Sequence, residues 1–465
     1  MTERLPANTA VSFDAAGDLH WAALSAIPEP ASLVELRRMV RAMLPRVDLP
    51  ELLLEVASWT GFLSAFTHIS GGGTRLDDLG VSAAAVLVAE ACNIGLTPVT
   101  KPGVAALTRG RLSHVDQNYA RAETIKAANA ALIDYQATIP LAQVWGGGLV
   151  ASADGMRFVV PVQTINAGPN PRYFGTGRGG TWFNMVNDQV AGISGVFVAG
   201  TLRDSLVLID AMHDQDGGAR PEVIMTDTGS YSDMVFGLLR LLGRRFAPRL
   251  ADMPDQKFWR IDPRADYGPL NPLARGRIDL GKVSRHWDDM ARLAGSLHTG
   301  AVRAYDTLRV LQRDGKPTAL GEAVAIYGRI DKSLHMLAVL DDKAYRRQIS
   351  NQLSIQESRH ALARRVFHGQ RGELRQRYRE GQEDQISALG LVLNAVTLFN
   401  TRYMNAALDQ LRAQGHPVLD ADVARLSPLI RKHLNVHGRY SFLLPELPGD
   451  LRPLRDPNTV DDDDA

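Results

Sequence analysis

The sequence predicts an α/β fold: a mixed β-sheet with flanking helices, preceded by an all-helical region and interrupted by a helical insertion. Three observations lead to this prediction. Residues 31–140 carry apolar side chains at three- and four-residue spacing, which is typical of helices. From Trp145 to Leu250, short apolar runs alternate with helix-like segments in the order β-β-β-α-β-α-β. Residues 262–350 begin rich in proline and then become helical, ahead of a helix that carries Glu357.

Composition narrows the class of protein. A length of 465 residues corresponds to about two to four domains. The net charge is +1, so any nucleic-acid surface must come from local basic patches. Cys92 is the only cysteine, which excludes an intramolecular disulfide and a multi-thiolate zinc site. Residues 81–96 are apolar but include Glu90 and fall short of the ~20 residues of a membrane span. With no signal-like N-terminus, we expect a cytoplasmic bacterial protein with no membrane partner.

The chain divides into four predicted regions. Residues 1–30 are expected to be loose, and residues 31–140 to be helical, including one long exposed helix, or two, between Thr108 and Asp134. Residues 141–445 are expected to form the sheet domain, with the insertion at 262–350 and a strong amphipathic helix at 385–412. The acidic tail, 446–465, is expected to be disordered.

The elements of the sheet domain follow in order. Strands are predicted within 146–165, 181–189, 195–200, 221–227 and 244–250, and helices within 204–214 and 232–243, the latter starting near Ser232.

Three acids occupy positions that suit metal ligands. Asp154 lies in the first predicted strand, Asp227 ends a later buried strand, and Glu357 lies on a helix. Ligands gather at the carboxyl ends of strands in open sheets. This order of acids is what an RNase H-like nuclease or transposase needs to hold two divalent ions, about 3.5–4 Å apart, around a phosphoryl transfer.

Each acid also has an ordinary structural interpretation. Asp154 precedes Gly155, and Asp-Gly is a strong signal for a hairpin turn. Asp227 is a candidate N-cap for the following helix, although Ser230 or Ser232 would serve as well. Glu357 is a candidate first-turn acid, favoured by the helix dipole. The pattern alone leaves these alternatives open.

The surroundings of Glu357 are basic. On a helix, His360 and Arg364 share its face. Seven arginines lie between residues 359 and 379, which suits a site that holds metal and phosphate together. The predicted DNA contacts on this stretch are Arg359, His360, Arg364, Arg365 and Arg371. The alternative is a solvated helix with ion pairs to Glu373 and Glu380.

Two apparent motifs do not carry function. Residues 175–180, GTGRGG, match the dinucleotide fingerprint, but a strand rather than a helix is predicted to follow. We expect instead a mobile loop near DNA, with Arg172 and Arg178 contacting phosphate. The histidines show no zinc spacing, so structural roles are predicted for His433 and His437.

Long blocks of the sequence resemble the replicative transposases of the Tn-three family. The resemblance runs from about residue 35 to 445, and its most distinctive blocks are LVAEACNIGLTPV, PRYFGTGRGGTWFNMVNDQ, MTDTGSYSDMVFGLLRLLG and ESRHALARRVFHGQRGELRQRYREGQEDQ. It implies a DD–E mechanism on an RNase H-like core, with Asp154, Asp227 and Glu357 as the catalytic triad. The long gap between Asp227 and Glu357 would house the helical insertion, which is usual in this family.

The resemblance also implies cofactors and partners. Two Mg²⁺ ions, with Mn²⁺ as a substitute, would support nicking at the transposon 3′ ends, and the freed 3′-OH would then attack target DNA to give a cointegrate. The partners would be transposon ends and target DNA, with a homodimer on paired ends.

Family members are roughly twice as long, so the sequence resembles their C-terminal catalytic half. Two further hypotheses therefore stand beside catalysis. One is a non-catalytic DNA-binding or assembly module of a truncated or split transposase, with the full-length transposase as a possible partner. The other is a stand-alone nuclease with little sequence preference.

Overall fold

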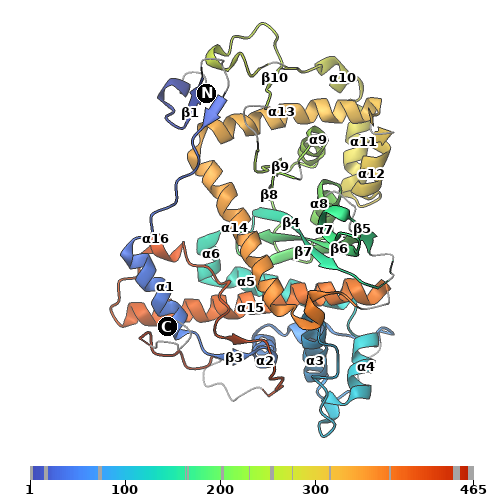
Figure 1. Ribbon diagram of the computed structural model, residues 1–465, viewed down its shortest axis with the longest axis vertical. Coiled ribbons are helices and arrows are strands. Elements are labelled where there is room, and N and C mark those ends of the chain that lie inside the picture. Colours follow the sequence, from blue (N-terminus) through green and yellow to red (C-terminus); the bar gives the residue numbers. More distant parts are fainter. Residues whose placement is uncertain are drawn as a thin grey trace.

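The computed structural model describes residues 4–14, 19–71, 76–162, 164, 167–199, 204–229, 231–251, 256–274, 276–313, 316–375, 379–443 and 451–458. The described residues form a mixed α/β structure in which helices surround a central sheet (Figure 1). Within them, no helix combines the length and apolarity that crossing a membrane requires.

The central sheet is mixed. Its main strands are β4 (Val150–Val159), β6 (Arg178–Asn187), β7 (Gly192–Ala199), β8 (Val223–Thr226) and β9 (Arg245–Phe246). Strands β4, β6 and β7 are antiparallel neighbours, whereas β8 and β9 continue the other side of β4 in parallel. Each of the five predicted strands is therefore present, although β9 is short. The two-residue strand β5 (Gly168–Pro169), which was not predicted, also pairs with β6.

Two helices connect these strands as predicted. They are α8 (Asp204–His213) and α9 (Asp233–Leu241). The Ser232 hydroxyl caps α9 by accepting a hydrogen bond from the Val235 amide at 3.3 Å, which confirms the predicted start near Ser232.

The insertion is mostly helical. It contains α10 (Leu280–Arg285), α11 (Trp287–His298), α12 (Ala304–Leu311) and α13 (Ala319–Asp341), with η5 (Gly268–Leu270) and the two-residue strands β10 (Trp259–Arg260), β11 (Gly276–Arg277), β12 (Gln312–Arg313) and β13 (Lys316–Pro317). Helix α13 packs closely on α9. Figure 1 shows α14 (Lys343–Val366) leaving the end of α13 and running obliquely over the sheet towards α15.

The N-terminal helices and the sheet share one apolar core. The helices are α1 (Ala31–Met43), α2 (Leu49–Thr60), α3 (Leu79–Ala91), α4 (Arg109–Asn118), α5 (Ala122–Thr138) and α6 (Pro140–Trp145), with η2 (Phe62–Ala65) and η3 (Ala105–Leu107). Their core also includes Phe158 and Trp182 from the sheet. The predicted boundary near residue 140 therefore does not separate two cores.

The segment 108–134 forms two helices, and the second is not exposed. Ile125 and Leu132 of α5 are buried, and α5 packs on α15 (Arg379–Ala413). The amphipathic face predicted for 385–412 is confirmed, since Ile386, Leu389, Leu393, Val396 and Phe399 are all buried. Helix α15 is also covered by α2 and α3, so it lies inside the helical region rather than at its surface.

Described residues near both ends of the chain are packed against the rest of the structure. After η1 (Leu5–Ala7), the antiparallel pair β1 (Val11–Phe13) and β2 (Leu19–Trp21) buries Leu5 and Leu19 beside Leu340 of α13. Residues 451–458 pack on α1 and α2, with Leu451 and Leu454 against the apolar core. These residues are thus packed within segments that the sequence predicts to be loose or disordered. Residues 446–450 and 459–465 lie outside the described part.

The remaining elements are short. They are β3 (Val47–Asp48), α7 (Pro171–Phe174), η6 (Gly369–Gly372), α16 (Asp420–Val423) and β14 (Leu434–Asn435), the last of which pairs with β3.

Candidate functional site

Asp154 and Asp227 lie at neighbouring positions of two paired strands. Strands β4 and β8 run parallel, and Ala153 pairs with Thr226, so each aspartate is the next residue along its strand. Asp154 lies within β4 opposite Asn184 of β6, which excludes the hairpin-turn interpretation. Asp227 is exposed directly after β8, and the cap of α9 is Ser232, so the N-cap interpretation of Asp227 is also excluded.

Helix α14 brings Glu357 to the same part of the sheet. Gln352 and Gln356 both bond to Ser152 of β4, at 3.2 and 2.9 Å, so this stripe of the helix faces β4. Leu353 shares an apolar cluster with Met225 of β8. Glu357 lies one turn after Leu353 and is exposed. It lies deep within α14, which begins at Lys343, so it is not a first-turn acid.

His360 links α14 to Asp154. Its Nδ1 lies 3.6 Å from Asp154 Oδ2, while its Nε2 lies 2.9 Å from Asn184 Nδ2 and 3.1 Å from Gln356 Nε2. Because both amide nitrogens can only donate, Nε2 accepts and the ring proton belongs on Nδ1, facing Asp154. Burial, together with Arg364 and Arg359, lowers the pKa of His360 to about 3, so the ring is neutral at pH 7.

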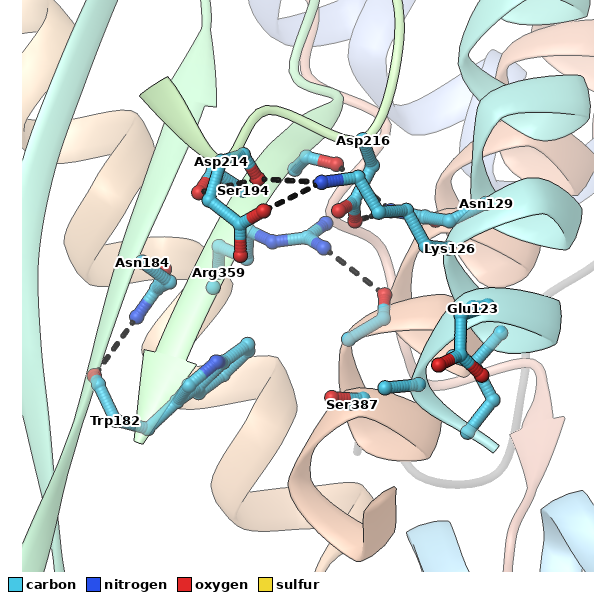
Figure 2. A pocket seen from close by; sticks show the side chains of 15 residues that line it. Glu123, Lys126, Asn129, Trp182, Asn184, Ser194, Asp214, Asp216, Arg359 and Ser387 are labelled. Atoms are coloured by element: carbon cyan, nitrogen blue, oxygen red, sulfur yellow. Dashed lines mark hydrogen bonds and ion pairs between the residues drawn. The ribbon is translucent and has the colours of Figure 1, made fainter. Parts of the chain in front are cut away.

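Two predicted DNA contacts are corrected by this geometry. His360 is buried on the side of α14 that faces the sheet. The side chain of Arg359 is among the largest fully buried side chains of the structure. Neither side chain can reach a phosphate without moving the helix. Burial lowers the pKa of Arg359 to about 9, and its Nη2 donates to the Gly390 carbonyl at 3.2 Å (Figure 2).

The other predicted DNA contacts are exposed. Arg364 and Arg365 lie near the end of α14, Arg371 lies in η6, and Arg172 and Arg178 lie beside the glycine-rich loop. That loop leads into β6 rather than into a helix, so it is not a dinucleotide-binding turn. The alternative ion pair with Glu373 is present, made by Arg375 at 2.6 Å; the side chain of Glu380 lies outside the described part.

The acids match a hard divalent cation in donor chemistry, since carboxylate oxygens are its preferred ligands. Their side chains do not converge on one point: among the described residues, no group of three or more His, Cys, Asp or Glu side chains is placed to hold a metal ion. One oxygen of each aspartate accepts a nearby backbone amide: Gly155 at 2.8 Å for Asp154, and Gly229 at 3.0 Å for Asp227.

Sequence reasoning missed the polar residues that support Asp154. Asn184, Ser152 and Gln356 form a buried hydrogen-bonded chain next to His360. The available signal was the polar stripe at residues 352, 356 and 360, which repeats every four residues on a helix. Of the two histidines expected to be structural, His433 is buried and its Nε2 bonds to Asn400 Oδ1 at 2.9 Å.

Comparison with known proteins gives a consistent result. Residues 51–440 match the family described as the Tn3 transposase DDE domain. The chain is 63% identical to the transposase for transposon Tn4556 of Streptomyces fradiae over 99% of this chain and 51% of that protein. It is 53% identical to the transposase for transposon gamma-delta of Escherichia coli K12, over 92% of this chain and 43% of that protein. It is also 33% identical to the transposase for transposon Tn1546 of Enterococcus faecium, over 89% of this chain and 42% of that protein. The chain thus spans about half the length of the curated relatives that it matches.

Proposed function

We propose that this chain, which belongs to the Tn3 transposase DDE domain family, cuts and joins DNA as the catalytic part of a DDE transposase. One observation carries the proposal: Asp154 lies in β4, Asp227 directly follows the parallel neighbour β8, and α14, which carries Glu357, packs on both strands. We further assign the sheet to the RNase H-like class. Support comes from its strand order β7-β6-β4-β8-β9, with three antiparallel strands followed by two parallel ones.

Asp154, Asp227 and Glu357 would hold divalent metal, on which a DDE domain depends. We propose two Mg²⁺ ions, for which Mn²⁺ substitutes. When bound, such ions lower the pKa of an attacking water or hydroxyl and stabilise the leaving oxygen. The protein's own part is to orient these carboxylates. His360 does this for Asp154 through Nδ1, and the buried chain of Asn184, Gln356 and Ser152 keeps the His360 ring in place.

The reaction would proceed in two displacements at phosphorus. Water first attacks the phosphodiester at each transposon 3′ end, the bond to the flanking nucleotide breaks, and a 3′-OH is released. That 3′-OH then attacks a phosphodiester of the target strand, a new bond to the transposon forms, and a target 3′-OH leaves. Replication from the joined strands would give a cointegrate.

The DNA surface is proposed to include Arg172, Arg178, Arg364, Arg365 and Arg371. All five are exposed, so they are available to backbone phosphates. Because the net charge is only +1, such local groups must supply the attraction. We propose transposon ends and target DNA as substrates, a homodimer on paired ends as the assembly, a full-length transposase as a further partner, and the bacterial cytoplasm as the location.

A strand-transfer assay tests the catalytic proposal. The purified chain is mixed with a pre-cut duplex bearing a free 3′-OH, supercoiled plasmid, and Mg²⁺ or Mn²⁺. Joined product is expected from the wild type, and Asp227→Asn should abolish it while leaving DNA affinity within about twofold. If Asp227→Asn joined the duplex to the plasmid nearly as well as the wild type, the assignment of the triad would be wrong.

The open arrangement of the three carboxylates supports one alternative, a non-catalytic DNA-binding or assembly module. Such a module would bind the duplex with or without metal and give no joined product, whatever the state of Asp227. Nicking of plasmid without any joining, if abolished by Asp227→Asn, would instead indicate a nuclease with little sequence preference.

A further inference from the structure

An aromatic ring lies at the surface beside the glycine-rich loop, in contact with two arginines. Tyr173 of α7 is 43% exposed. The guanidinium carbon of Arg157, in β4, lies 3.7 Å from the centroid of the Tyr173 ring, and that of Arg172 lies 5.3 Å from it. At these distances both cations are attracted to the electrons of the ring face. The surface therefore presents an aromatic side chain with two positive charges next to it.

The helical turn that carries Tyr173 is docked on the sheet by the next residue. A Cβ at Gly179 of β6 would lie 2.2 Å from Phe174 Cζ, so the Phe174 ring occupies the space that the glycine leaves open. Phe174 is half-buried there, whereas Tyr173 stays exposed. The sheet thus fixes the backbone of α7, and the tyrosine ring is held towards solvent.

The donors of the two arginines are not used by the fold. Within the described part of the chain, the exposed guanidinium groups of Arg157 and Arg172 make no hydrogen bond or ion pair. Another arginine beside a tyrosine, Arg260 near Tyr267 in the insertion, donates to protein acceptors through all three of its guanidinium nitrogens. That arginine serves the local structure. The donors around Tyr173 remain available to a ligand.

We propose that Tyr173 stacks on an unpaired nucleobase, an inference that rests on the proposed function because it takes DNA as the substrate. Every base has a flat face that stacks on an exposed aromatic ring, whatever the sequence. Bases inside a duplex are covered by their neighbours, so the stacked base lies outside the double helix. Arg157 and Arg172 would bind the phosphates beside it through charge-assisted hydrogen bonds.

This base belongs to a nucleotide away from the reacting phosphate. Arg157 follows Asp154 by three residues in β4, so the two lie about 10 Å apart along the strand. Successive side chains point to opposite faces of a strand, so Arg157 points away from the face on which Asp154 meets His360. Tyr173 is therefore a positioning residue, which holds a single-stranded segment and takes no part in the chemistry.

Fluorescence anisotropy of the whole chain with labelled DNA tests this inference. The probes are a duplex with a short single-stranded 3′ tail and the same duplex with abasic residues in the tail, which keep the phosphates but lack the bases. The titrations are done in EDTA, where metal-dependent cutting and joining cannot occur. The wild type is expected to bind the tail with bases at least about fivefold more tightly than the abasic tail. Tyr173→Ala should remove this preference and leave the affinity for the abasic tail within about twofold.

Two further variants separate stacking from packing. Tyr173→Phe keeps the ring and should keep the preference for bases, whereas Tyr267→Ala removes a tyrosine beside a structural arginine and should leave that preference unchanged. Equal weakening of both tailed duplexes by Tyr173→Ala would assign Tyr173 a packing role and overturn the inference.

The outcome for the wild type separates this inference from the proposed function. If the wild type binds both tailed duplexes equally well, or if Tyr173→Ala keeps the preference for bases, the inference is wrong and the proposed function stands. If the wild type binds neither duplex, the result contradicts the proposed function and the inference together.

Discussion

At the scale of single residues, one turn of α14 carries both exposed and buried side chains. Glu357 is exposed, whereas Gln356, Arg359 and His360 are buried against the sheet and α15. The proposed catalytic acid and the buried polar groups therefore belong to adjacent stripes of one helix. The buried contacts that fix the rotation of α14 therefore also fix the direction in which Glu357 points.

The contact between His360 and Asp154 can be tested with two amide substitutions. His360→Asn keeps a donor near the position of Nδ1, whereas His360→Gln keeps a polar group near Nε2 and loses the donor to Asp154. We expect Mn²⁺ affinity, measured by electron paramagnetic resonance, to be nearly retained in His360→Asn. In His360→Gln it should fall by about 10–100-fold, the usual effect of losing a partner of a metal ligand. Equal affinities in both variants would assign His360 a packing role only.

Glu90 of α3 is expected to make stability depend on pH. Burial, with Asp116 and Asp384 nearby, raises the pKa of Glu90 from 4.5 to about 8. The folded state therefore holds a proton that the unfolded state releases, and stability should fall as pH rises from about 4.5 to about 8. Burial also raises the pKa of Asp216 from 3.8 to about 6. Its ionisation should therefore lower the stability further in the lower part of that pH range.

Urea denaturation at a series of pH values measures this dependence. Glu90→Gln cannot ionise, so its stability should change much less between pH 5 and pH 8 than that of the wild type. An identical slope in both proteins would show that Glu90 ionises at its ordinary pKa in the folded state.

At the scale of elements, the contact between α9 and α13 depends on two glycines. A Cβ at Gly237 would lie 2.2 Å from the Val324 carbonyl oxygen, and one at Gly328 would lie 1.9 Å from the Asp233 carbonyl oxygen. The backbones thus approach more closely than any side chain would permit. Through this contact the insertion, which ends in α13, is attached to the helix that follows Asp227.

Gly328→Ala is expected to force α9 and α13 apart. Its cost should be about 1–3 kcal/mol or more, because backbone atoms rather than flexible side chains stand in the way. Gly295→Ala is the matched control, since Gly295 is an exposed position of α11 and nothing lies within 4 Å of its added Cβ. That control should be neutral or stabilising by up to ~1 kcal/mol. Denaturant unfolding of both variants compares them, and equal stabilities would contradict the close contact.

At the scale of the whole molecule, the last described segment, residues 451–458, closes the helical region. Arg452 Nε donates to the buried Glu55 carboxylate of α2 at 2.6 Å, and Nη2 donates to Glu51 at 3.0 Å. The Tyr403 hydroxyl of α15 donates to Glu55 and accepts from the Arg452 amide. The segment 451–458, α2 and α15 thus share one group of buried polar contacts.

Arg452→Met should therefore destabilise the protein strongly. Removing one partner leaves the fully buried Glu55 without its counter-charge, at a cost of roughly 3–5 kcal/mol. Arg38→Met is the control, because Arg38 is exposed and its solvent-screened ion pair with Glu35 should contribute little to stability. Adding Glu55→Gln to Arg452→Met should recover part of the loss. Equal effects of Arg38→Met and Arg452→Met in urea unfolding would contradict a buried network.

The sequence by itself determined the order of strands and helices from Trp145 to Leu250, the start of α9 at Ser232, and which acids follow which elements. These features depend on local periodicity and on capping chemistry, which neighbouring residues carry. Only the tertiary structure decided the rest: the burial of Arg359 and His360, the pairing of β4 with β8 that brings Asp154 near Asp227, and the packing of residues 451–458. Arginine and histidine in a polar helix favour solvent unless distant segments cover them. That cover comes here from β6, β7 and α15, whose contacts with α14 depend on the whole chain being folded.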